Sequence, residues 1–184
     1  MDGFIRDWYY GNKRMENHTV YKFDMGAVKG KDYRSEITPQ TNLSCGLAIG
    51  YMGIQFLEDF KYTTKRGYGF KNCDTVKAVD RGTPDLLRRD FVEGEDPCEF
   101  VIEAPRGQYE LFVVSGDECE DSITILDAVN GRTTGGEVVK KGRYQCKLLS
   151  VMQEEDELIV LKISTQKGYK WKINCIFVNA VKGY

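Results

Sequence analysis

The sequence predicts an all-β protein built as an antiparallel β-sandwich of jelly-roll type. Short segments rich in β-branched and aromatic residues recur at regular spacing through the second half, with Gly, Pro and Asn turn signals between them. No long amphipathic helix pattern and no internal repeat is present. The length of 184 residues suits one domain with a real core.

The first strand is expected at residues 19–26, where β-branched and aromatic residues dominate although apolar and polar positions do not alternate perfectly. Asn130-Gly131 is a strong hairpin signal between two later strands. From Cys98 onward the β pattern is continuous, with strands expected at 98–103, 108–115, 122–129, 142–150, 157–164 and 171–181.

The remaining segments divide the chain into an arm and one domain. Residues 1–18 are polar and aromatic without a clear period, so we expect an N-terminal arm before a single sandwich domain at 19–184. Residues 27–50 predict a long loop or insertion. Within the charged segment 71–98, Pro84 could begin one helical turn, but no major element is expected there.

Composition excludes several classes of function. With 26 basic and 28 acidic residues the chain lacks the basic excess of a nucleic-acid binder, and no stretch approaches the roughly 20 apolar residues of a membrane span. The single histidine, His18, excludes two-histidine metal centres. The N-terminus shows no apolar signal-peptide core, so we expect an extracellular location only if the chain derives from a secreted enzyme, and a cytoplasmic one otherwise.

The six cysteines have no zinc-finger spacing. Reduced, half-buried thiols are the first expectation, because a chain of this length does not need disulfides to be stable. Disulfides are the alternative. The cysteines are Cys45, Cys73, Cys98, Cys119, Cys146 and Cys175.

Catalytic constellations are weak. The order of residues 115–117, Ser-Gly-Asp, is wrong for a GDSL-type serine, so we expect a strand end that turns through Gly116 and is fixed by Asp117. Paired carboxylates for glycosidic chemistry are available, but each lies near a cation in the sequence, so structural ion pairs explain them better. These carboxylates are Asp59, Asp80, Asp85 and Asp90.

Two aromatic pairs are candidates for contact with a sugar, because flat rings stack on sugar faces while charged groups bind hydroxyls. Tyr62 and Tyr68 lie near Arg66, and Tyr169 and Trp171 form the second pair. In the Gly-Tyr-Gly-Phe run at 67–70 we expect Tyr68 and Phe70 to point to opposite sides, with one of them in the core.

Two acidic runs, at 117–121 and 154–157, leave calcium open as a cofactor, since hard cations need several oxygen ligands. Neither run has EF-hand spacing, and solvated acidic turns are the default interpretation. We expect no other metal or cofactor.

An ordered series of motifs suggests a family. The chain resembles the galactose-binding-like β-sandwich domain found next to agarases and rhamnogalacturonan acetylesterase-type GDSL esterases, over residues 20–181. The resemblance implies an accessory module without esterase activity. The motifs are Phe-Asp-Met-Gly at 23–26, Tyr62, Gly-Tyr-Gly-Phe at 67–70, Asp-Arg-Gly at 80–82, the charged run 85–92, Phe100, Pro105 with Gly107 and Tyr109, Ser-Gly-Asp at 115–117, and Ile173-Asn174 with Ile176.

The sequence therefore predicts a non-catalytic carbohydrate-binding or accessory module that binds plant or algal cell-wall glycan, with a catalytic domain as a further partner. One alternative is a structural module that orients a neighbouring domain, and another is a glycan-active enzyme fragment that uses carboxylates. The expected ligand-binding residues are Tyr62, Tyr68, Arg81, Arg88 and Asp117, with Tyr169 and Trp171 as a second patch.

Overall fold

The computed structural model describes residues 18–26, 54–56, 61–85, 87–129, 132–154 and 157–183. All regular secondary structure in these ranges is β-strand. The predicted loop at 27–50, and all of the predicted arm except His18, lie outside the described residues.

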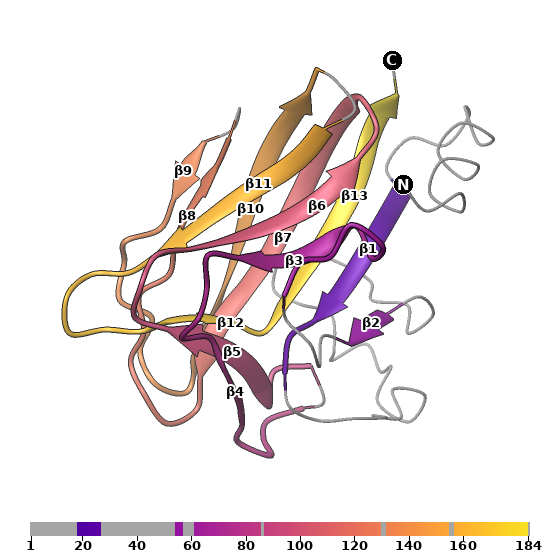
Figure 1. Cartoon of the computed structure of the whole chain (residues 1–184). Coiled ribbons are helices and arrows are strands. Elements are labelled where there is room, and N and C mark those ends of the chain that lie inside the picture. Colours follow the sequence, from indigo (N-terminus) through magenta and orange to yellow (C-terminus); the bar gives the residue numbers. More distant parts are fainter. Residues whose placement is uncertain are drawn as a thin grey trace.

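In the described ranges, thirteen strands form two five-stranded sheets and a smaller three-stranded sheet (Figure 1). The first sheet has the order β10 (Arg143–Gln153), β7 (Gly107–Asp117), β13 (Cys175–Gly183), β1 (His18–Asp24) and β2 (Ile54–Phe56). The second has the order β3 (Tyr68–Lys71), β6 (Cys98–Ala104), β11 (Glu157–Ser164), β8 (Ile125–Ala128) and β9 (Thr133–Thr134). The third has the order β12 (Trp171–Ile173), β5 (Asp90–Gly94) and β4 (Lys77–Asp80).

The prediction of an all-β sandwich is confirmed. Every strand pair is antiparallel except β1 with β2, which is parallel. Strands β8 and β9 pair with Leu126 opposite Thr134, so they form the hairpin that Asn130-Gly131 predicts, although these two turn residues lie outside the described ranges. The jelly-roll strand order stays a prediction.

The core fills the space between the two large sheets and is rich in aromatic rings. Phe23 from β1 packs edge-on against Phe100 from β6, with ring centroids 5.1 Å apart. Phe70 from β3 lies 4.9 Å from Phe100 and stacks at 6.3 Å on Trp171 from β12. The rings thus join strands from all three sheets.

Strand β1 explains the imperfect alternation in its sequence. Its register with β13 shifts between Thr19 and Tyr21, which is a bulge that adds one residue to the strand. After the bulge, Tyr21, Phe23 and Met25 are all buried at a spacing of two residues.

The third sheet is a departure from the prediction, which placed no strand between residues 71 and 97. Strand β5 is buried along its whole length although Asp90 and Glu93 belong to it. The acidic residues interrupt the alternation that is expected of a half-buried strand. The sequence of β5 therefore indicates a loop rather than a strand.

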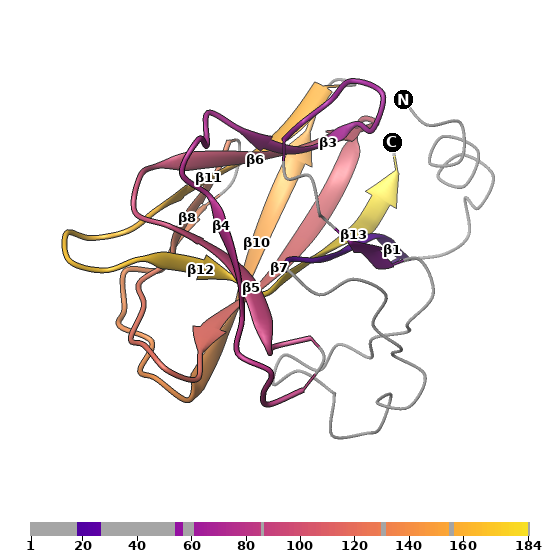
Figure 2. The same cartoon turned by 60° about the horizontal axis from the view of Figure 1, so that its bottom comes forward.

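The predicted strand at 171–181 is in fact two strands, separated at Asn174. Strand β12 pairs with β5 in the third sheet, whereas β13 pairs with β7 and β1 in the first (Figure 2). The Asn174 side chain donates hydrogen bonds to the carbonyl oxygens of Arg88 and Asp90, at 3.0 and 3.3 Å, and so fixes the transfer between sheets.

The turn predicted at Pro84 begins instead at Asp85. The Asp85 carboxylate accepts hydrogen bonds from the backbone N–H groups of Leu87 and Arg88, and its carbonyl accepts one from the N–H of Arg89. Asp85 is therefore the cap of a single turn rather than its second residue.

The expectation of reduced thiols is wrong for two of the six cysteines. Cys73, after β3, forms a disulfide with Cys98 at the start of β6. Cys119 is an exposed free thiol, whereas Cys146 is half-buried and Cys175 is buried. Cys45 lies outside the described residues.

Candidate functional site

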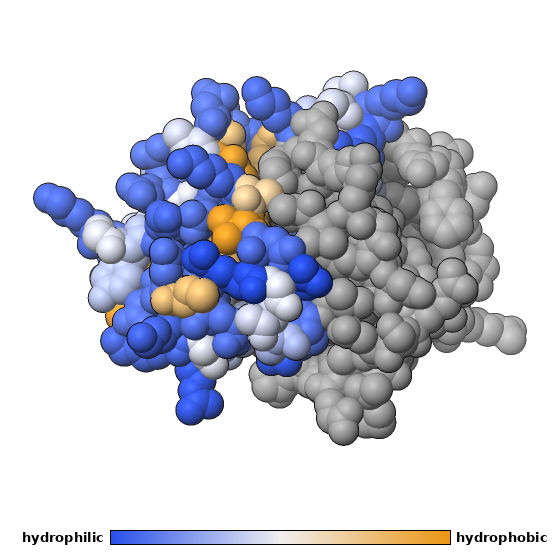
Figure 3. Space-filling view, turned by 90° about the horizontal axis from the view of Figure 1, so that it is seen from below, coloured by the Kyte–Doolittle hydropathy of each residue, from blue (hydrophilic) through white to orange (hydrophobic). Residues whose placement is uncertain are grey.

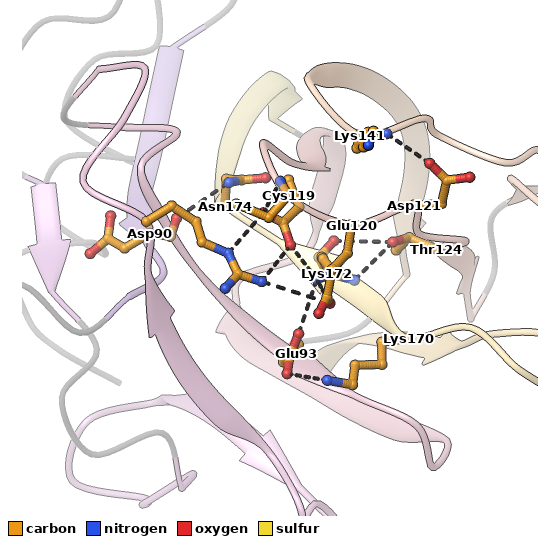
Figure 4. Close-up of polar contacts among 12 residues, drawn as sticks. Asp90, Glu93, Cys119, Glu120, Asp121, Thr124, Lys141, Lys170, Lys172 and Asn174 are labelled. Carbon is orange, nitrogen blue, oxygen red and sulfur yellow. Dashed lines mark hydrogen bonds and ion pairs between the residues drawn. The ribbon is translucent and has the colours of Figure 1, made fainter.

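Six charged side chains form one network at the end of the sandwich that carries the third sheet (Figure 4). Three cations face three carboxylates, so the network is neutral as a whole. We call it the ion cluster, and it consists of Arg81, Glu93, Asp117, Glu120, Lys170 and Lys172.

Asp117, at the end of β7, is the centre of the ion cluster. Arg81 donates two parallel hydrogen bonds to it, from Nε to Oδ1 at 3.0 Å and from Nη2 to Oδ2 at 2.9 Å. The backbone N–H of Cys119 donates a third to Oδ1 at 3.0 Å, and Lys172 a fourth to Oδ2. The hydrogen bond from Cys119 confirms that Asp117 fixes the turn, and the bidentate arginine makes its geometry rigid. The expected turn through Gly116 is wrong, because Gly116 lies within β7, where it pairs with Tyr144, and the strand ends only at Asp117.

Lys172 is fully buried and binds three carboxylates. Besides Asp117, its Nζ lies 2.8 Å from Oε2 of Glu120 and 3.1 Å from Oε2 of Glu93. The same ammonium lies 4.7 Å from the centre of the Phe91 ring, and the Arg81 guanidinium lies 5.6 Å from it. The buried Phe91 ring is therefore an apolar floor under both cations.

The charged groups of the ion cluster hold each other ionised. Burial alone would raise the pKa of Asp117, but the hydrogen bonds from Arg81 and Lys172 outweigh it and lower that pKa below its usual value. Burial would lower the pKa of Lys172, but the carboxylates of Asp117, Glu120 and Glu93 raise it. The hydrogen bond from Lys172 likewise lowers the pKa of Glu120.

The ion cluster has buried and exposed members. We call the three partly exposed residues, Arg81, Lys170 and Glu120, the rim. The side chains of Lys172 and Asp117 are 0% exposed, whereas those of Arg81, Lys170 and Glu120 are 25%, 36% and 49% exposed. Figure 3 looks onto the sandwich from below, and the described residues there are mostly hydrophilic with a few isolated hydrophobic spots. The rim therefore offers fixed polar groups to solvent.

Tyr62 and Tyr68 lie at strand β3 and not at the ion cluster. Tyr68 packs its ring on Phe23 at 4.8 Å, and the Arg66 guanidinium lies 5.3 Å from the ring centre. Tyr68 and Phe70 point to the same side, not to opposite sides, because residues two apart in a strand share a face. Tyr68 is thus mainly a core residue.

Tyr62 is half-buried, and its side chain contacts Glu103 and Lys71. Its hydroxyl donates to Oε1 of Glu103 at 2.7 Å, which raises the pKa of Tyr62, and the Lys71 ammonium lies 4.4 Å from the ring centre. One face of the Tyr62 ring is therefore already covered by a cation.

Arg88 binds within its own turn and does not join the ion cluster. Its Nε donates to Oδ2 of Asp85 at 2.6 Å, and its guanidinium lies 5.1 Å from the ring centre of Tyr144. A second ion pair joins Arg89 to Asp80, with two hydrogen bonds of 2.8 Å. The prediction that these carboxylates serve structural ion pairs is confirmed for Asp80 and Asp85, and Asp59 lies outside the described residues.

The second predicted patch is divided between surface and core. Tyr169 is half-buried in the loop before β12, next to Lys170 of the rim. Trp171 is 1% exposed, and its indole N–H donates to the carbonyl of Asp96 at 2.8 Å. The stacking role expected of Trp171 is therefore corrected to a core role, since a buried ring cannot stack on a ligand.

The acidic run at 117–121 is largely neutralised by cations. Besides the pairs above, Asp121 binds Lys140 at 2.8 Å. Within the ranges that the structure describes, no group of three acidic, cysteine or histidine residues is placed to hold a metal ion. Calcium binding stays a prediction.

Sequence reasoning missed Lys172, Glu93 and Phe91 as parts of this site. Their signal is a lysine and a glutamate inside short apolar segments, Trp-Lys-Ile at 171–173 and Phe-Val-Glu at 91–93. Opposite charges in two buried strands indicate a buried ion pair. The pairing of Lys172 with Glu93 across β12 and β5 bears this out.

The described part of the chain contains no helix that is long and apolar enough to cross a membrane. No protein-family model matches the sequence, and no curated protein matches it.

Parts of several solved structures share the fold of this chain. Protein YXIM from Bacillus subtilis has a TM-score of 0.56 at 17% identity, over 88% of this chain and 40% of that one. A β-glucuronidase from Bacteroides uniformis has a TM-score of 0.59 at 14% identity, over 93% of this chain and 18% of the enzyme. The ectodomain of ANX1 from Arabidopsis thaliana has a TM-score of 0.55 at 11% identity, over 91% and 49%.

These likenesses establish the fold class and no more, because identity is below one fifth in each. The chain spans less than half the length of each of these structures.

Proposed function

We propose that the chain is a non-catalytic glycan-binding module whose ligand site is the rim of the ion cluster. The observation that carries this proposal is that buried charged groups hold an exposed rim in place. Arg81, Lys170 and Glu120 keep part of their polar surface in solvent, while the buried groups of Asp117, Glu93 and Lys172, respectively, fix their positions. Polar groups held in place before binding lose little conformational entropy when a ligand arrives.

The chemistry of the rim suits a sugar. Glu120 accepts hydrogen bonds from hydroxyl groups, and the cations of Arg81 and Lys170 donate to hydroxyls or to the carboxylate of an acidic sugar. The half-buried ring of Tyr169 adjoins Lys170 and adds a flat surface for the C–H face of a sugar ring. Attachment to a catalytic domain would raise the local substrate concentration. The association with agarases or pectin-directed esterases that the sequence resemblance implies stays a prediction.

Affinity electrophoresis tests this proposal, with gels that contain pectic, galactan or agar polysaccharides. We expect retardation of the unaltered chain in at least one gel, and its loss in Tyr169→Ala. Tyr62→Ala, an aromatic truncation at β3, is the matched control and should keep the retardation. Loss of binding in Tyr62→Ala alone would move the site to β3, and no retardation in any gel would refute the proposal. Turnover of a polysaccharide by this chain would contradict its non-catalytic part.

A structural module is the second candidate, and the internal pairing of the charged motifs favours it. Arg81, Arg88 and Tyr68 all make contacts within the chain that rigidify its own loops. Such a module would orient a neighbouring domain without binding sugar. Co-expression with a neighbouring domain distinguishes the structural module from the glycan-binding module. A structural module should raise the melting temperature of that domain and should bind no glycan.

A further inference from the structure

Strand β10 is an open edge of the first sheet. It spans 11 residues and pairs with β7 along its whole length without a register shift. Its other side has no partner strand among the described residues. An edge of this kind presents a row of backbone N–H and C=O groups that another strand can pair with.

The other edges are protected by being short. In the described part of the chain, β2, β3, β4, β9 and β12 end the sheets, and each has two to four residues. Natural proteins blunt edges by short strands, prolines and bulges. Strand β10 is the exception among these edges, because it is long and contains no proline and no bulge.

The outer face of β10 is apolar as well as unpaired. Leu148 and Met152 are 49% and 37% exposed, and they are two of the four large exposed hydrophobic residues that the structure describes. Partly buried Cys146 and Tyr144 continue the same face and pack on a small apolar cluster with Phe177. A strand paired at this edge would lie beside these side chains and remove part of their apolar surface from water through cross-strand contacts.

One feature of β10 would ordinarily oppose pairing. An inward-pointing charge is a common device that keeps an edge strand free, and Lys147 points inward. Lys147 is only 5% exposed, however, and its ammonium already donates to the carbonyl of Thr124. Pairing of a further strand with β10 would therefore desolvate the Lys147 ammonium only slightly.

We propose that two copies of this chain associate through antiparallel pairing of their β10 strands. The midpoint of Arg143–Gln153 is Leu148, so a two-fold axis at Leu148 pairs all 11 residues of each strand. In that register Leu148 meets Leu148 of the second copy, Tyr144 meets Met152, and Cys146 meets Ser150. No two like charges are opposite, because Arg143 meets Gln153 and Lys147 meets Leu149.

A mass measurement by light scattering across a concentration series tests the association. We expect the mass to rise with concentration toward twice the 21.0 kDa of the chain. Leu148→Lys places two ammonium groups opposite each other and should weaken the dimer by about tenfold or more. Val129→Lys, at an exposed hydrophobic residue next to β8, is the matched control and should leave the mass unchanged.

Cross-linking tests the register itself. Ser150→Cys places a thiol opposite Cys146 of the second copy, so oxidation should give a covalent dimer on a non-reducing gel. Adding Cys146→Ser to this variant should abolish that dimer. A monomer at every concentration would overturn the proposal and leave the edge to a strand of a different protein, and a dimer without the Cys146-dependent cross-link would overturn the interface.

Discussion

At the scale of single residues, Lys172 is the one on which the ion cluster depends. It is fully buried, and its ammonium touches the carboxylates of Asp117, Glu120 and Glu93. A buried charge network is costly to desolvate, and its stability depends on complete pairing. Removing the lysine leaves Asp117 and Glu93 as buried carboxylates with fewer partners.

Lys172→Met should therefore lower the free energy of unfolding by about 3–5 kcal/mol. Urea denaturation measures it. Lys140→Met removes the surface pair with Asp121, where the lysine side chain is 70% exposed, and should leave the free energy of unfolding nearly unchanged. Equal losses in the two variants would show that Lys172 is not the centre of the network.

Lys147 should make stability rise with pH. Burial lowers the pKa of Lys147 from 10.5 to about 8 in the folded chain. Between these values the unfolded chain binds one more proton than the folded chain, so the free energy of unfolding increases as pH rises from 8 toward 10.5. Lys147→Met should flatten this slope in denaturation curves at pH 7.5, 9 and 10. An unchanged slope would contradict the shift.

At the scale of elements, the pairing of strands β5 and β12 depends on the close packing of the Trp171 ring against Gly94. Gly94 is opposite Trp171, and a Cβ placed on Gly94 would lie 2.4 Å from Cζ2 and 2.7 Å from Cε2 of the indole. The third sheet therefore needs glycine at this position so that the Trp171 ring can pack against it.

Gly94→Ala should destabilise the chain by about 1–3 kcal/mol through this overlap. The atoms that collide belong to the part of the indole that phenylalanine lacks. In a double-mutant cycle, Trp171→Phe should therefore reduce the cost of Gly94→Ala, as thermal denaturation would show. Strictly additive effects would mean that the indole does not cause the strain.

The disulfide ties the end of β3 to the start of β6 across 25 residues of sequence. Cys73→Ser should lower the free energy of unfolding by about 2–4 kcal/mol, because the unfolded chain gains freedom. A reducing agent should reproduce this loss in the unaltered chain and leave Cys73→Ser unaffected. If the reductant changes neither protein, these cysteines are not bonded.

The strands that could be predicted are those with simple surroundings. Strands β7 and β10 alternate over most of their length, and β6 and β11 each contain an apolar run, so the local pattern decides them. The third sheet could not be predicted, because its buried Glu93 and Lys172 are tolerated only through a partner far away in the sequence. The same reason applies to the site. Arg81 and Asp117 were expected as ligand contacts, and their mutual bond appears only when β4 and β7 come together.

At the scale of the whole molecule, the described residues form a sandwich with one polar, rigid end and one long edge strand, β10, that has no second partner strand among them. The ion cluster fixes the loops at the polar end, and the Phe91 ring supports it from below. The rim residues stay accessible, and a β10–β10 dimer would present two such rims to a repeating polymer. Two sites on one particle bind such a ligand more tightly than one site does.

The most direct test of this account is an NMR titration of the isotopically labelled chain with oligosaccharides from the glycan that retards it in gels. We expect the backbone signals of Arg81, Glu120, Tyr169 and Lys170 to shift together and saturably, while those of Tyr62 and Lys71 at β3 stay in place. Shifts confined to β3, or no saturable shift with any oligosaccharide, would contradict the claim that the rim of the ion cluster binds glycan.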